Sequence, residues 1–308
     1  MRKVIGIGET VTDIIIRNGV PQQMVCGGST LNSMVTLGRC GLCPSFVSEV
    51  GNDRLGQQTK SFLTDNGVDN SYVAMAQDKK SKLSLAFLDA NNDADYTFYQ
   101  DAKPDTFPNK LPNICRDDVV VYGSYYALNP AFHSSLSTYL HRAKEAGALI
   151  YYDVNFRPTY LSQLHSLQAQ IDDNLSLASI VRGSDEDFRN IFGTDSATEI
   201  YGKIHTKCGV LVITRGTKGV DVITPSLMTH YDVAKVDVVS TIGAGDTFNA
   251  GVALSIIAHG ISESQLATLP QSSWDKIIQT ATQLSAEVCG STDNYISKAT
   301  GQSLRLCK

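Results

Sequence analysis

Five short runs of consecutive apolar residues predict strands that are buried on both faces. These runs are rich in Val, Ile and Tyr and occupy residues 4–7, 119–122, 149–153, 180–181 and 210–214. Continuous rather than alternating hydrophobicity is typical of parallel strands that are covered by helices on both sides. We therefore expect a mainly parallel sheet at the centre of the fold.

Segments with a helical pattern lie between these runs. Residues 29–41 place apolar side chains mostly on one face and end in glycine, as many helices do, and a second helical stretch, 131–147, is also closed by glycine. Residues 247–259 are nearly all small or apolar and precede Gly260, which predicts a buried helix. Strand–helix alternation over this length predicts an α/β fold with right-handed crossovers.

Two regions, about 10–25 and 82–100, interrupt the alternation. Both contain short segments with a period of two, and the second holds two of them, at 84–88 and 96–99, around a polar turn over 89–95. We expect these regions to form a small antiparallel sheet attached to the main body. With no internal repeat and no linker, the chain is interpreted as one domain, 1–308.

Composition and charge bear on which molecules the protein binds and where it is found. The 308 residues carry 26 Lys and Arg against 31 Asp and Glu, a net charge of −5, so nothing indicates nucleic-acid or anionic-membrane binding. Seven scattered cysteines are typical of reduced thiols rather than a disulfide framework. With no signal peptide and no apolar stretch near 18 residues, we expect a cytoplasmic protein that does not enter membranes.

The segment 240–251 carries the most informative chemistry. Gly243, Ala244 and Gly245 allow a tight turn and a close approach to a ligand. The helix that follows directs unpaired N–H groups and the positive end of its dipole at the same place, which makes an anion hole. Asp246 would stand at its mouth, where a carboxylate can accept a hydrogen bond from an attacking hydroxyl. Taken alone, this segment fits an ordinary helix cap equally well.

Four motifs that follow one another along the chain favour a catalytic site over an ordinary helix cap. They are 241–248 (TIGAGDTF); 27–32 (GGSTLN) with 37–41 and 50–56; 153–158 (DVNFRP); and 214–219 (TRGTKG). Together they resemble the PfkB-type, ribokinase-like carbohydrate kinases over essentially the whole chain, from Gly6 to about Gly290, and 153–158 is similar to fructokinase-like members. The resemblance implies a three-layer αβα body with a mainly parallel sheet and a small β-sheet lid from about 10–25 and 82–100.

The resemblance also implies roles for single residues. Sugar binding is assigned to Asp13, Gly27, Gly28, Asn32 and Asp246. Catalysis is assigned to Asp246 as the base, to the anion hole of Gly243, Ala244 and Gly245, and to Arg157, which would reach the transferring phosphoryl group or the sugar. ATP binding is assigned to Ser184, Thr214, Gly216, Gly243, Gly245 and, near adenine, Gln279. A weak base suffices at Asp246 because phosphoryl transfer chiefly requires orientation of the nucleophile.

Three departures from the family pattern affect the cofactors and the sugar. Ser184 and Asp187 stand where relatives carry Asn-x-x-Glu, so Mg²⁺ would be contacted through water by Asp187. Ser240 replaces a common aspartate, which argues against activation by K⁺ or another monovalent cation. Gln100 stands where fructokinase-like proteins often carry arginine, so the identity of the sugar stays open.

The favoured hypothesis is an ATP- and Mg²⁺-dependent sugar kinase that phosphorylates fructose, works as a homodimer joined through its lids and has no nucleic-acid partner. The open alternatives are 2-keto-3-deoxygluconate, ribose, a nucleoside or a sugar phosphate as acceptor. For a phosphorylated acceptor, Lys80, Lys82 and Lys103 are the candidate cations. A catalytically idle sugar or nucleotide sensor is a further alternative. An NAD-dependent dehydrogenase is disfavoured because Gly6-x-Gly8 lacks the third glycine of the dinucleotide fingerprint. Residues 51–56 begin like a P-loop but lack its lysine, so no P-loop is predicted there.

Overall fold

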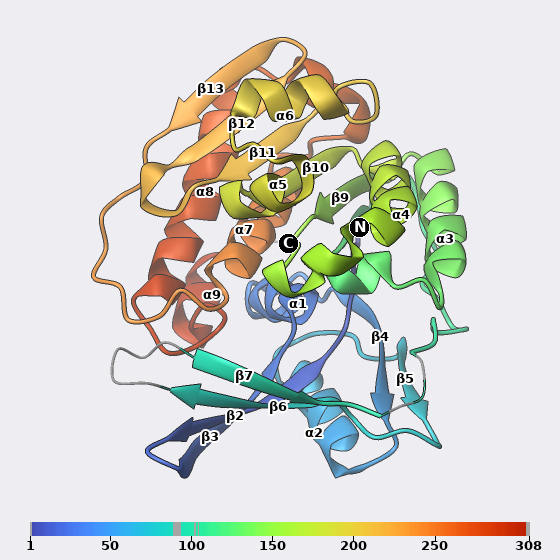
Figure 1. Ribbon diagram of the computed structural model, residues 1–308. Helices are drawn as coiled ribbons and strands as arrows, with labels where there is room; N and C mark the ends of the chain where they lie inside the picture. Colours follow the sequence, from blue (N-terminus) through green and yellow to red (C-terminus); the bar gives the residue numbers. More distant parts are fainter. Residues whose placement is uncertain (1, 89–93, 102, 104, 306–308) are drawn as a thin grey trace.

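A nine-stranded sheet covered by helices on both faces forms the main body (Figure 1). The computed structural model describes residues 2–88, 94–101, 103 and 105–305. The strand order is β13-β12-β11-β10-β9-β8-β1-β4-β5. The strands of this sheet are β1 (Val4–Ile7), β4 (Ser45–Gly51), β5 (Val73–Ala76), β8 (Val119–Gly123), β9 (Leu149–Asp153), β10 (Ile180–Ser184), β11 (Leu211–Thr214), β12 (Val220–Thr224) and β13 (Leu227–Tyr231).

The sheet is parallel from β11 through β5, whereas β12 and β13 are antiparallel additions at one edge. This confirms the predicted mainly parallel sheet. The bounds of β1 and β9 match the predicted runs, while β11 begins at Leu211 rather than at residue 210. All five residues of β8 are buried, as expected for a central strand with helices on both sides.

Two groups of helices form the outer layers. One apolar core cluster joins the sheet to side chains of α1, α2, α7 and α8, and a second joins its other face to α3, α4, α5 and α6. The helices are α1 (Ser29–Arg39), α2 (Arg54–Asp65), α3 (His133–Glu145), α4 (Leu164–Leu177), α5 (Asp185–Phe192), α6 (Ala197–Ile204), α7 (Ala244–Ala258), α8 (Gln271–Cys289) and α9 (Lys298–Ser303).

Helix α7 is largely buried, as its composition predicts. Every residue from Thr247 to Ile256 is buried, with α1 and α8 packed against the helix. The helix begins three residues earlier than the predicted 247, so Ala244 and Gly245 belong to its first turn rather than to the preceding loop. This places the glycine-rich motif at the amino end of the helix itself.

A second sheet lies apart from the main body, beneath α1 in the view of Figure 1. Its order is β3-β2-β6-β7, from β2 (Val11–Arg17), β3 (Val20–Gly27), β6 (Leu83–Leu88) and β7 (Ala94–Tyr99). The prediction of an antiparallel sheet was wrong in one respect: β2 and β6 pair in parallel, which joins two antiparallel hairpins into a mixed sheet. Residues 89–93 of the predicted turn lie outside the described residues, and β7 already begins at Ala94. We call this sheet the lid.

Candidate active site

Asp246 lies in the first turn of α7, directly after a left-handed turn. Gly243 is the N-cap with a φ of 79°, and a Cβ there would lie 2.3 Å from the backbone oxygen of Asn294. Only glycine meets both conditions without strain. The first-turn amides of a helix have no intrahelical acceptor, although that of Ala244 donates back to Thr241 at 3.3 Å. The turn therefore presents N–H groups and a carboxylate at one point.

Two residues of α1 hold Asp246 in place. Asn32 donates from Nδ2 to Asp246 Oδ2 at 2.8 Å, and Ser33 donates from Oγ to the backbone oxygen of Asp246 at 2.7 Å. Burial raises the pKa of Asp246, the Asn32 hydrogen bond lowers it, and the nearby charge of Asp153 raises it further. Asn32, predicted to bind sugar, thus also orients the predicted base. Ser33 is a contact that the sequence reasoning missed.

The predicted sugar residues of the lid meet at its base. Asp13, on β2, hydrogen-bonds Ser84 of the neighbouring strand β6, and a Cβ on Gly27 would lie 2.9 Å from Asp13 Oδ2. Gly28 has a φ of 132°, and a Cβ there would lie 2.4 Å from the backbone oxygen of Glu9. Burial raises the pKa of Asp13, while the Ser84 hydrogen bond lowers it. Asp13 and the two glycines therefore form one group where the lid joins α1.

The predicted ATP residues gather at the carboxyl ends of β10 and β11. Ser184 and Thr214 are register partners in the sheet. Asp187 forms a capping box with Ser184, in which Asp187 Oδ2 accepts bonds from the Ser184 amide at 2.7 Å and hydroxyl at 2.8 Å. Gly216 is exposed just beyond β11. This is the edge of an open α/β sheet where ligands commonly bind.

Arg157 and Gln279, two further predicted site residues, are both exposed. Arg157 is exposed in the segment after β9, and its charge lowers the pKa of Asp246, so it acts on the site electrostatically. Gln279 is exposed on α8. Because Ser285 of α8 bonds the backbone oxygen of Ala244 at 2.9 Å, Gln279 stands six residues, or about 9 Å of helix, beyond the level of the anion hole.

A buried polar network behind the site was not found from the sequence. Arg182 bonds Asp153 at 2.9 Å and Thr214 at 2.7 Å, and Asn249 bonds Asp153 at 2.9 Å and Tyr151 at 2.9 Å. Buried arginine is rare unless it is paired, and the pairing is visible only in three dimensions. Asp153 and Thr214 stand in two of the family motifs, but nothing in the sequence pattern connects them with Arg182.

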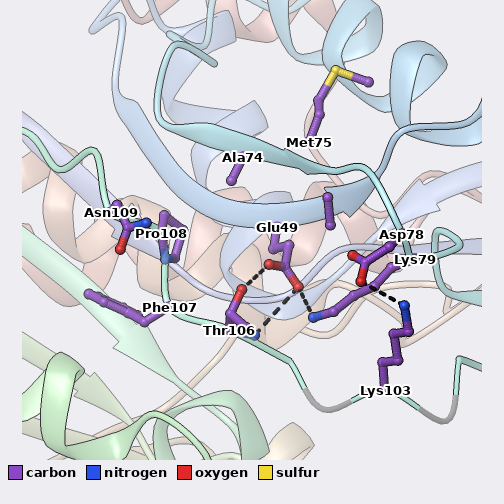
Figure 2. Close-up of a pocket in the computed structure, with 11 residues that line it drawn as sticks. Glu49, Ala74, Met75, Asp78, Lys79, Lys103, Thr106, Phe107, Pro108 and Asn109 are labelled. Carbon is purple, nitrogen blue, oxygen red and sulfur yellow. Dashed lines mark hydrogen bonds and ion pairs between the residues drawn. The ribbon is translucent and has the colours of Figure 1, made fainter.

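A separate pocket of about 460 Å³ lies beside edge strand β5 and contains Lys103 but none of the residues assigned to sugar binding, catalysis or ATP binding (Figure 2). Its charges bind one another: Glu49 contacts Lys79 and Thr106, and Lys103 pairs with Asp78 at 2.6 Å. These contacts attach the segment that returns from the lid to the main body. The pocket is therefore interpreted as part of the junction between the lid and the body, and not as the site of chemistry.

Two features are absent from the residues that the structure describes. Among them, no group of three or more His, Cys, Asp or Glu side chains is arranged to hold a metal ion. Within the same residues, no helix combines the length and the apolar character that crossing a membrane requires.

Comparisons with known proteins agree with this geometry. The chain matches the pfkB family carbohydrate kinase model over residues 1–300. It is 26% identical over 273 residues to a fructokinase of Klebsiella pneumoniae, covering 87% of this chain and 89% of that protein. It is also 26% identical over 259 residues to aminoimidazole riboside kinase of Salmonella typhimurium, covering 83% and 81% of the two chains.

Solved structures show the same fold. Aminoimidazole riboside kinase of Salmonella enterica, complexed with aminoimidazole riboside and an ATP analogue, superposes with a TM-score of 0.80 at 23% identity, covering 95% of each chain. Fructokinase of Vibrio cholerae O395, with bound fructose, ADP and calcium, gives 0.79 at 23% identity, covering 96% of this chain and 94% of that one. The fold, the collinear motifs and the match over residues 1–300 lead to one conclusion: this chain belongs to the pfkB family of carbohydrate kinases.

Proposed function

We propose that this sugar kinase transfers the γ-phosphoryl group of ATP to a hydroxyl of fructose, with Asp246 as the base and residues 1–308 acting as one kinase domain. The observation that carries the proposal is the placement of Asp246 by Asn32 at the amino end of α7. The sugar hydroxyl attacks the γ-phosphorus, its proton passes to Asp246, and the bond from that phosphorus to ADP breaks. Amides of the first turn stabilise the transferring charge.

Fructose is favoured over a phosphorylated acceptor by the charges at the lid junction. Lys82, one of the candidate cations, bonds both Glu9 at 2.9 Å and Asp105 at 2.8 Å, so this cluster carries a net negative charge. Lys103 pairs with Asp78 in the pocket described above. Since cations already bound to carboxylates offer little to a phosphate, an uncharged sugar fits better. The likeness to the Klebsiella fructokinase supports fructose among such sugars.

Mg²⁺ would accompany ATP rather than occupy a protein cage. Both hydrogen bonds that the Asp187 carboxylate accepts from Ser184 go to Oδ2, so its other oxygen can bind a water of the ion. This fits Mg²⁺, which keeps several waters and is held largely by substrate phosphates, where it neutralises their charge. A related Vibrio fructokinase structure contains potassium, but Ser240 here favours turnover without it. An enzyme that consumes ATP also suits the expected cytoplasmic location.

The acceptor is tested by measuring ADP release over a panel of fructose, 2-keto-3-deoxygluconate, ribose, fructose 1-phosphate, adenosine and aminoimidazole riboside. The highest kcat/KM is expected for fructose. Preference for aminoimidazole riboside would favour the second candidate, which the Salmonella riboside kinase suggests. No sugar-dependent release of ADP with any acceptor, combined with measurable binding, would indicate the idle sensor.

A homodimer through the lids is supported by apolar side chains on the lid surface. Ile14 pairs with both Met24 and Leu85, so these three share one face of the lid, opposite to Asp13. Met24 is 43% exposed, and Phe87, on the same face, is 42% exposed. Exposed apolar patches of this kind mark interfaces.

The dimer is tested by light scattering after size exclusion. Replacing both lid side chains, M24K with F87K, should convert the dimer to a monomer. The control is M228K, at an equally apolar, 62% exposed position on β13 of the main body, which should leave the dimer intact. A monomeric wild-type protein at micromolar concentration would refute the dimer.

A further inference from the structure

A buried ion pair lies directly behind the first turn of α7. Arg182 Nη1 donates to Asp153 Oδ1 at 2.9 Å, and Nη2 donates to Thr214 Oγ1 at 2.7 Å. Arg182 is 6% exposed and Asp153 is 3% exposed. Removing two charges from water costs about as much as, or more than, their attraction returns. Stability alone therefore gives no reason for an ion pair at this position.

The carboxylate of this pair connects the two helices that build the site. Asp153 Oδ2 accepts a bond from Asn249 of α7 at 2.9 Å and a longer one from Ser29 of α1 at 3.4 Å. Tyr151 donates to the other end of the Asn249 side chain at 2.9 Å, which fixes its amide. Asp153 therefore contacts both the helix that carries Asp246 and the helix that carries Asn32.

The guanidinium also lies against the backbone of the catalytic turn. A Cβ on Gly245 would lie 3.1 Å from Nη2 and 3.2 Å from Nη1 of Arg182. The ring of Phe248, one turn farther along α7, lies 5.6 Å from the guanidinium carbon. The first turn of α7 thus rests on a cation whose other contacts are made by β9 and β11.

Charge provides a second link between the pair and Asp246. The negative charge of Asp153 raises the pKa of Asp246, while the positive charge of Arg157 lowers it. The charged and titratable groups that face Arg182 are Asp153, Tyr151 and Asp187. Without the cation, Asp153 would be left as an unbalanced carboxylate beside the predicted base.

We propose that Arg182 is a positioning residue for phosphoryl transfer: through Asp153 it fixes the first turn of α7 and balances the second carboxylate beside Asp246. This inference rests on the proposed role of Asp246 as the base. It assigns no contact with the substrate to Arg182, which acts through Asp153 and the backbone of Gly245.

The test compares the pH dependence of kcat among variants, because a purely structural role would not move it. In R182M the acidic limb of the plot of kcat against pH should move to higher pH by about one unit, and kcat should fall about 100-fold. R182K keeps the charge and should leave the limb near its wild-type position. D153N removes the opposing carboxylate and should move the limb to lower pH. The control is R189M, which changes an exposed arginine of α5 and should alter neither quantity.

The outcomes separate this inference from the proposed function. If R182M does not fold, as its melting curve would show, D153N still tests the inference, because its carboxamide can keep the Asn249 and Ser29 contacts. An acidic limb that stays at its wild-type position in folded R182M and in D153N would overturn the role of Arg182. Full turnover in D246N would instead refute the base on which this role rests. If D246N is inactive but the acidic limbs of R182M and D153N do not move, the role of Arg182 is refuted and the role of Asp246 as the base stands.

Discussion

Asn32 and Asp246 are 214 positions apart in the chain, yet the Asn32 amide donates a 2.8 Å hydrogen bond to the Asp246 carboxylate. One side of the carboxylate is thereby fixed, and the hydrogen bond favours its charged form. The same asparagine has a buried oxygen, Oδ1, with no partner among the described residues. That oxygen is closed to solvent, so the observed contact assigns Asn32 to the base, and its contact with the sugar stays a prediction.

Replacing Asn32 with Ala should therefore lower kcat by about 10- to 100-fold, because misplacement of a reacting group is costly. Loss of the hydrogen bond should also raise the pKa of Asp246 and move the acidic limb of the rate profile upward. Steady-state kinetics across pH measure both effects. An N52A variant, at an exposed asparagine, is the control. Unchanged kcat in N32A would contradict the positioning role.

Asp246→Asn should reduce kcat by at least about 1,000-fold while ATP binding persists. It should also raise the melting temperature at neutral pH. Burial raises the folded-state pKa of Asp246 above the unfolded value. The carboxyl group therefore destabilises the fold increasingly as the pH rises above the unfolded pKa, and the cost is complete above the folded-state pKa. This cost disappears below the unfolded pKa, near pH ~4. The difference in melting temperature should therefore grow as the pH rises from about 4; a difference independent of pH would contradict the assignment.

Gly243→Ala should destabilise the protein by about 1–3 kcal/mol and reduce kcat by more than about 100-fold. The added Cβ meets the Asn294 backbone as well as an unfavourable φ of 79°. Gly260→Ala, at the other end of α7, is a matched control. Its φ of 62° imposes similar strain, but the control Cβ meets nothing within 4 Å. Urea unfolding measures the loss of stability in both variants. Steady-state kinetics should show normal activity in Gly260→Ala and not in Gly243→Ala.

Asp187→Asn should separate helix capping from metal binding. An asparagine oxygen can still accept the Ser184 bonds, so the melting temperature should stay within about 2 °C of the wild type. Loss of the charge should raise the Mg²⁺ concentration needed for half-maximal rate several-fold. Titration of activity with Mg²⁺ at fixed ATP measures this. An unaltered Mg²⁺ requirement would leave Asp187 with its capping role alone.

The identity and order of the central elements could be predicted from the sequence because their signals are local. The run 149–152 is apolar throughout, as expected for a strand covered on both faces, and the structure places β9 at Leu149–Asp153. The turn before α7 was likewise evident, since Gly243 and Gly245 stand next to the helix they begin. Strand partners are not local. The parallel pairing of β2 with β6 joins segments about 70 residues apart and was mispredicted as antiparallel.

What the sequence alone determined was therefore the fold class, the family motifs and the candidate base Asp246. Tertiary structure alone decided which groups surround that base. Arg182 carries no motif, and its importance depends on Asp153, Thr214 and Gly245, which lie on three other segments of the chain. Hydrogen bonds and charge interactions depend on distance in space, and a linear pattern records distance along the chain. For that reason the chemistry of the site could be anticipated, while its supporting network could only be observed.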